Sequence, residues 1–111
     1  MTHEVDERAG GVVVAVQGAA LGGPDGAQLY ETLQALQDQG HGRVVLDLRG
    51  LTRINPRGLG LFIAGLALLR NGGGELRFAH LPDAMHSLLV ITQLRASVPC
   101  FDSVEAALAA D

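Results

Sequence analysis

The sequence predicts an α/β domain with a mostly parallel sheet of about four to five strands and about four helices. Short apolar runs alternate along the chain with longer segments in which leucines recur at helical spacing. Turns rich in glycine separate the two kinds of segment. Strands that alternate with helices form βαβ units, and such units place their strands in parallel.

The predicted strands are short apolar runs bounded by glycine or proline. The first contains Val12-Val13-Val14, which is typical of a strand buried on both faces. A glycine-rich loop is expected from Gly18 to Gly26, and a connecting turn is expected from Gly50 to Asn55. Pro99 suits an edge strand because proline cannot donate a ladder hydrogen bond. The four predicted strands span residues 11–16, 44–48, 75–79 and 98–101.

The predicted helices follow from leucine spacing and from signals at their ends. Leu29, Leu33 and Leu36 form one apolar stripe with polar residues between them. Asn71 and the three glycines after it end the second helix. Asp102 or Ser103 is expected to cap the last helix. The four predicted helices begin near residues 25, 56, 82 and 103.

The composition indicates a single globular domain, residues 1–111, and disfavours several classes of protein. Hydrophobic residues make up 48% of the chain and charged residues 18%, which is not a disordered composition. A net charge of −4 without a basic run disfavours nucleic acid and anionic membranes as partners. Cys100 is the single cysteine, which favours a reducing, cytoplasmic compartment. The chain starts with charged residues rather than a signal peptide, and its longest apolar segment, residues 59–69, is too short to insert directly into a membrane.

The most informative segment joins the second predicted strand to the second predicted helix. Asn55 is a favoured N-cap because its side-chain oxygen can accept a hydrogen bond from a free amide of the first turn. Pro56 suits the first helical position, where its missing N–H costs nothing. Gly58 and Gly60 keep the start of the helix narrow, so another surface could approach it. A well-formed helix start packed on the sheet would explain the same residues.

In order and spacing, these segments resemble a STAS domain, the family of anti-anti-sigma factors and related regulatory modules. The resembling parts are Leu46-Asp47-Leu48, Gly58-Leu59-Gly60, the glycine turn at residues 72–74 and the closing segment at residues 101–108. The resemblance implies a protein-protein interaction module without a cofactor or an enzymatic activity. It implies an anti-sigma factor of the kinase type as the partner, or alternatively the ATPase of a membrane transport complex.

The turn of this chain differs from the family pattern. Where relatives read Asp-Ser-Ser-Gly-Leu, this sequence has Asn55-Pro56-Arg57-Gly58-Leu59. The resemblance places the phosphoacceptor serine at Pro56, which has no hydroxyl, so the usual phosphorylation switch is expected to be absent. Arg57 opposes the helix dipole by about 0.3–1 kcal/mol. Arg57 is therefore expected either to turn into solvent or to meet an acidic group on a partner.

The second helix is predicted to be apolar on two faces. One face, with Leu59, Phe62 and Leu66, is expected to pack on the sheet. The other face contacts a partner or a second copy of the chain, or a neighbouring helix covers it. The residues predicted to bind a partner are Thr52, Asn55, Pro56, Arg57, Gly58, Leu61, Gly65 and Leu68.

Other chemistry finds little support in the sequence. His80, Asp83 and His86 are close in sequence but fall on different predicted elements, so they are not expected to share a metal ion. The glycines form neither a phosphate loop nor a dinucleotide fingerprint. Thr52 and Ser87 remain as hydroxyls that a kinase could modify. A small-molecule-binding protein with a pocket at the strand ends is kept as a third hypothesis.

Overall fold

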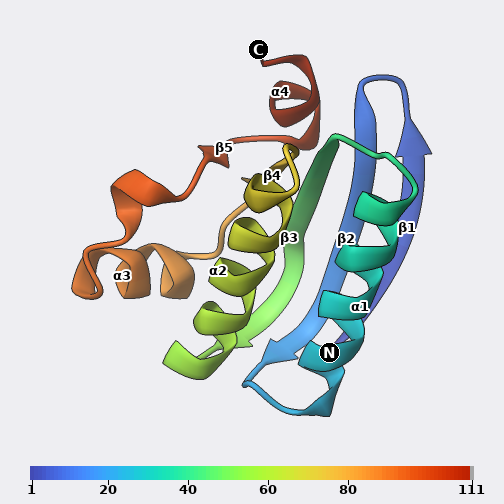
Figure 1. Ribbon diagram of the computed structural model, residues 1–111. Helices are drawn as coiled ribbons and strands as arrows, with labels where there is room; N and C mark the ends of the chain where they lie inside the picture. The colour runs from blue at the N-terminus through green and yellow to red at the C-terminus, as the bar shows by residue number, and fades with distance from the viewer. Residues whose placement is uncertain (111) are drawn as a thin grey trace.

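The computed structural model describes residues 1–110 as a five-stranded sheet with helices on both faces (Figure 1). The strands lie in the order β1-β2-β3-β4-β5; β1 is antiparallel to β2, and the other neighbouring pairs are parallel. This confirms the predicted mostly parallel α/β fold. The elements are β1 Thr2–Arg8, β2 Gly11–Ala20, α1 Pro24–Asp38, β3 Arg43–Ile54, α2 Pro56–Asn71, β4 Glu75–Ala79, α3 Asp83–Ile91, the 3₁₀ turn η1 Arg95–Ser97, β5 Cys100–Phe101 and α4 Val104–Ala109.

The two faces of the sheet bury different helices. The larger core lies between the sheet and α1, α2 and α3, and it takes Val12 and Val14 from β2. The smaller core lies on the opposite face, where Val13 packs with Val104 and Ala107 of α4. Consecutive valines point to opposite faces because side chains alternate along a strand. A strand that is buried on both faces therefore needs the continuous apolar run that the sequence shows.

The strand predictions were wrong in three places. The sequence interpretation missed β1, an edge strand whose charged residues mask any apolar alternation. The predicted loop and the predicted turn both start later than expected, because β2 continues through Gly18 to Ala20 and β3 through Gly50 to Ile54. Gly50 serves close strand pairing rather than a turn: a Cβ there would lie 2.9 Å from the carbonyl oxygen of Val16.

The helix predictions agree closely with the structure. Helix α2 spans Pro56–Asn71 as predicted, with Asn55 as its N-cap. Helix α3 begins at Asp83, one residue after the predicted start, and Pro82 is its N-cap. Ser103 rather than Asp102 caps α4, since its side chain accepts a hydrogen bond from the amide of Ala106.

A buried arginine holds α4 on the sheet. Arg77 is 5% exposed, and its guanidinium donates hydrogen bonds to the carbonyl oxygens of Ala107, at 2.6 Å, and Ala110. The same guanidinium pairs with Glu75 at 2.8 Å and lies 5.4 Å from the centre of the Phe101 ring. A six-residue helix is too short to be stable alone. The docking of α4 therefore depends on these contacts and on its small apolar face.

We expect Arg77→Met to lower the free energy of unfolding by about 2–3 kcal/mol, because hydrogen bonds from a charged group to buried carbonyls are lost. Urea unfolding followed by circular dichroism measures this change. Arg8→Met is the matched control, because Arg8 pairs only with the exposed Asp6. Equal midpoints for the two variants would show that Arg77 does not hold α4.

Candidate functional site

Asn55 joins three elements at the end of the sheet. Its backbone N–H donates to the carbonyl oxygen of Ala20, the last residue of β2, at 3.2 Å. Its side-chain oxygen accepts from the backbone N–H of Gly58 at 2.8 Å, and its side-chain amide donates to the carbonyl oxygen of Leu21 at 3.3 Å. One residue thus fixes the end of β2, the start of α2 and the loop before α1. This arrangement confirms the predicted cap and adds contacts that the sequence did not reveal.

Gly58 lies beneath the turn rather than on its outer surface. It is buried, and a methyl group in its place would overlap the carbonyl oxygen of Ala20. Gly60, in contrast, is exposed, and a Cβ there would meet nothing within 4 Å. Gly58 therefore permits the start of α2 to pack against the end of β2, while Gly60 faces solvent.

The outer surface of the turn consists of exposed residues on a rigid support. Thr52, Pro56 and Arg57 are all exposed. The Arg57 side chain lies beside Gly22, where an added Cβ would come within 2.7 Å of the Arg57 Cβ. Gly22 has a φ of 83°, a conformation that glycine adopts readily.

The loop between β2 and α1, residues 21–23, therefore belongs to the same surface. Leu21 is 39% exposed there. The sequence interpretation missed this loop as part of the site. The only signal was its glycines, which indicate a turn but not its neighbours.

Helix α1 covers the second apolar face of α2. The Leu61 side chain fills the space above Gly26, and the Leu33 side chain lies over Gly65. The Gln37 amide donates to the carbonyl oxygen of Leu68 at 3.0 Å. Leu61, Gly65 and Leu68 thus lie between the two helices, apart from the exposed turn. The solvent side of α2 is formed instead by residues with small side chains: Gly60, Ala64 and Ala67.

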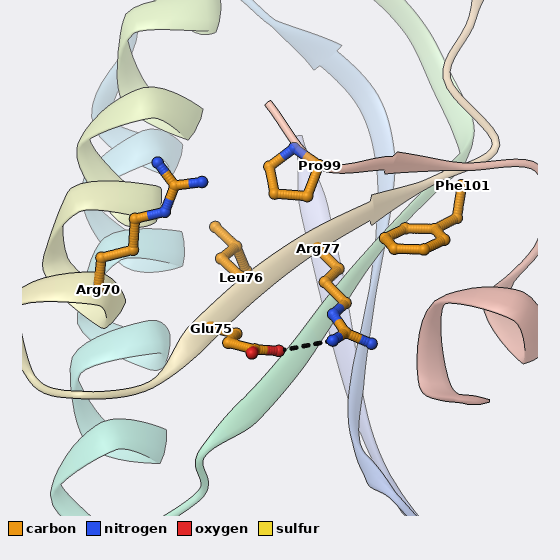
Figure 2. Close-up of a pocket in the computed structure, with 6 residues that line it drawn as sticks. All are labelled: Arg70, Glu75, Leu76, Arg77, Pro99 and Phe101. Atoms are coloured by element: carbon orange, nitrogen blue, oxygen red, sulfur yellow. Dashed lines mark ion pairs between the residues drawn. The ribbon is translucent and has the colours of Figure 1, made fainter. Parts of the chain in front are cut away.

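A pocket of about 290 Å³ lies at the far end of α2 (Figure 2). Figure 2 shows Arg70 on one side, and Glu75 and Arg77 on the sheet, with Phe101 beyond them. Glu75 and Arg77 pair with each other, and Arg70 donates to the carbonyl oxygen of Ser97 at 3.3 Å. These groups are engaged in holding β4, α4 and η1 together.

His80, His86 and Cys100 lie around a smaller pocket of about 170 Å³. His80 lies 2.8 Å from the Arg49 guanidinium, and its ring nitrogen accepts because a guanidinium only donates. Across residues 1–110, no three His, Cys, Asp or Glu side chains are placed to hold a metal ion together. Burial raises the pKa of the Cys100 thiol, against a smaller opposing effect of Arg95. A raised pKa lowers the fraction of nucleophilic thiolate.

Within residues 1–110, no helix has both the length and the apolar character required to cross a bilayer.

The fold and the exposed helix start together define a small α/β module that presents an ordered turn at the end of its sheet. A family model described as "Mlab, STAS domain" matches residues 3–99. The chain therefore belongs to the STAS domain family. No curated protein matches the chain.

Solved structures with the same fold come from proteins of different roles. An anti-sigma factor antagonist from Mycobacterium paratuberculosis is 22% identical, with 96% of this chain and 90% of that chain covered and a TM-score of 0.79. The phosphorylated form of SpoIIAA, a Bacillus cell fate determinant, is 15% identical over 95% of this chain and 96% of that chain, with a TM-score of 0.72. A sulfate transporter family protein from Wolinella succinogenes is 16% identical over 87% and 80%, with a TM-score of 0.68. At these identities the similarity shows a shared fold.

We expect Gly58→Ala and Gly60→Ala to change stability in opposite directions. Gly58→Ala forces a methyl group into the Ala20 carbonyl and should lower the free energy of unfolding by about 1–3 kcal/mol. Gly60→Ala places the same methyl group in open space, where alanine favours the helix by about 0.5–1 kcal/mol. Thermal unfolding of both variants measures the difference. Similar melting temperatures would contradict the close approach of α2 to β2.

Proposed function

We propose that this chain is a cytoplasmic, non-enzymatic regulator that binds a protein partner through the Asn55–Gly60 turn and the solvent side of α2. This proposal rests on one observation: some residues of the turn fix its backbone, and others are exposed to solvent. Asn55 and Gly58 hold the backbone from beneath, while Pro56 and Arg57 face solvent. A surface that is already ordered loses little conformational entropy on binding, so most of the contact energy contributes to the affinity.

The first candidate partner is an anti-sigma factor of the kinase type. The similar folds of anti-sigma factor antagonists, including that from Mycobacterium paratuberculosis, support this candidate. Arg57 indicates an acidic group on the partner, because its exposed guanidinium can form a charge-assisted hydrogen bond with a carboxylate.

The proposed complex is not controlled by phosphorylation of the turn. Pro56, at the position that the family resemblance assigns to the phosphoacceptor, is the first residue of α2 and carries no hydroxyl. Its neighbours Asn55 and Arg57 carry none either. Thr52 and Ser87 are exposed, but Thr52 belongs to β3 and Ser87 to α3. A kinase partner would therefore remain bound unless another signal releases it.

The second candidate partner is the ATPase of a membrane transport complex. The fold shared with a sulfate transporter family protein from Wolinella succinogenes supports this candidate. The same turn and helix would form the docking surface, and the missing hydroxyl would then have no regulatory consequence.

Arg57→Glu should weaken binding of the captured partner by at least about tenfold, because a carboxylate would replace a guanidinium at a charged contact. The partner is first captured from the native cell extract with wild-type protein and identified by mass spectrometry, and affinities are then measured by calorimetry. The melting temperature should change little, since Arg57 is exposed. Arg8→Glu, on the edge strand β1, is the control. An unchanged affinity for Arg57→Glu would remove this residue from the interface.

Incubation with the captured kinase and ATP should leave residues 55–57 without phosphate. Tandem mass spectrometry of the peptide that contains this turn tests the expectation. Pro56→Ser is the informative comparison, because it restores a hydroxyl at the start of α2. A phosphate on the Pro56→Ser protein, but not on wild type, would support the proposed loss of the switch. A phosphate within wild-type residues 55–57 would disprove it.

A further inference from the structure

Helix α2 carries only basic charge although the chain as a whole is acidic. It contains Arg57 and Arg70 and neither Asp nor Glu, whereas the net charge of the chain is −4. Both arginines are exposed. Arg49 and Arg53 alternate along β3 with residues of the larger core, so their side chains leave the opposite face of the sheet. The neighbouring helix α1 carries the exposed Glu31 and Asp38 and no basic residue, while its Asp25 pairs with the N-terminal amine at 2.6 Å. The chain therefore presents a basic surface beside an acidic one.

The arginines of this surface have no acidic partner within residues 1–110, unlike several arginines of the sheet. Arg43 and Arg77 pair with Glu75, and Arg8 pairs with Asp6. Arg70 donates to a backbone carbonyl, which leaves its positive charge unneutralised. The guanidinium groups of Arg57 and Arg70 remain able to form a charge-assisted hydrogen bond with an external carboxylate.

The arginines lie at the two ends of α2, and the surface between them is apolar. Arg57 and Arg70 are thirteen residues apart on one helix, which corresponds to about 20 Å. The exposed residues between them include Gly60, Ala64 and Ala67, whose small side chains leave room for a close approach. Helix α3 contacts α2 and lies beside it in Figure 1.

Helix α3, which neighbours α2, exposes larger apolar side chains. Val90 is 66% exposed and Ile91 75%, and together with His86 and Ser87 they line an open hollow of about 410 Å³. Val90 and Ile91 lie near the end of α3. They are on the exposed side of this helix, because Met85 and Leu89 occupy its buried side. Exposed apolar area thus lies on the helix next to the one that carries the unpaired arginines.

We propose that the α2 surface binds an acidic, amphipathic helix of a partner protein. This inference rests on the proposed function and specifies the chemistry of the partner. Carboxylates near the two ends of that helix pair with Arg57 at one end and with Arg70 at the other. Its apolar side lies over Ala64 and its neighbours on α2. The acidic α1 repels carboxylates on its own side, and this repulsion favours one position of the partner over others.

A protein helix fits this surface better than a nucleic acid or a lipid bilayer does. Among residues 1–110, the exposed large hydrophobic residues are Val5, Leu21, Val90 and Ile91, so no exposed aromatic ring is available for stacking on bases. The acidic α1 lies next to the arginines and would repel a phosphate backbone or an anionic membrane, both of which extend well beyond 20 Å.

Two synthetic peptides test this inference. Both are 16-residue helices with identical apolar positions; one carries Glu at both ends, and the other carries Lys at the same positions. Titration into ¹⁵N-labelled protein should shift the amide signals of α2 with the Glu peptide, and the Lys peptide should bind at least about tenfold more weakly. The Arg57→Glu/Arg70→Glu variant should reverse this preference. Because a reversed preference requires a folded protein, it also excludes misfolding as the cause.

Equal binding of the two peptides, or shifts confined to α1 and β1, would overturn the inference. Tighter binding of single-stranded DNA or of phosphatidylglycerol vesicles would overturn it as well, in favour of a phosphate-bearing partner. These outcomes differ from a failure of the proposed function. If a captured protein partner depends on Arg57 but the peptides bind equally, the binding role stands and only the acidic helix is wrong. If no protein partner is captured at all, the proposed function fails whatever the peptides show.

Discussion

Strands β2 and β3 run parallel through the middle of the molecule, with helices packed on both of their faces. Their pairing extends to Ala20 and Ile54, so both strands end at the same level of the sheet. Asn55 follows directly and bonds back to the last residue of β2. The position of α2 is therefore set by the ends of two buried strands and not by a flexible loop. Burial on both faces makes a slip in their register costly, because apolar side chains would lose their places in both cores.

The same arrangement separates the residues that support the surface from those that can touch another protein. Gly58 and Asn55 hold the start of α2 against the sheet, and Leu61 and Leu68 contact α1. Substitutions among the exposed residues can therefore change what the surface binds without disturbing the fold. The turn can lose a hydroxyl and gain a guanidinium on the same scaffold, which is the difference between this sequence and the pattern that it resembles.

Local signals in the sequence predicted the helices better than the strands. Pro56 and the glycines after Asn71 mark both ends of α2, and these signals act within a few residues. Strand β1 was missed because its formation depends on pairing with β2 and not on its own residues. The extension of β3 past Gly50 and the covering of Leu61 by α1 depend on neighbours that are distant in sequence.

Helix α4 packs on the face of the sheet opposite α2. A fluorophore, an affinity tag or a chip surface attached beyond α4 would therefore leave the α2 side unobstructed. The sequence has no lysine, so no side-chain amine on the α2 side would react with an amine-coupling reagent. A sensor that is anchored behind the sheet would present the helical face outward in a single orientation, so that every immobilised molecule reports on the same side.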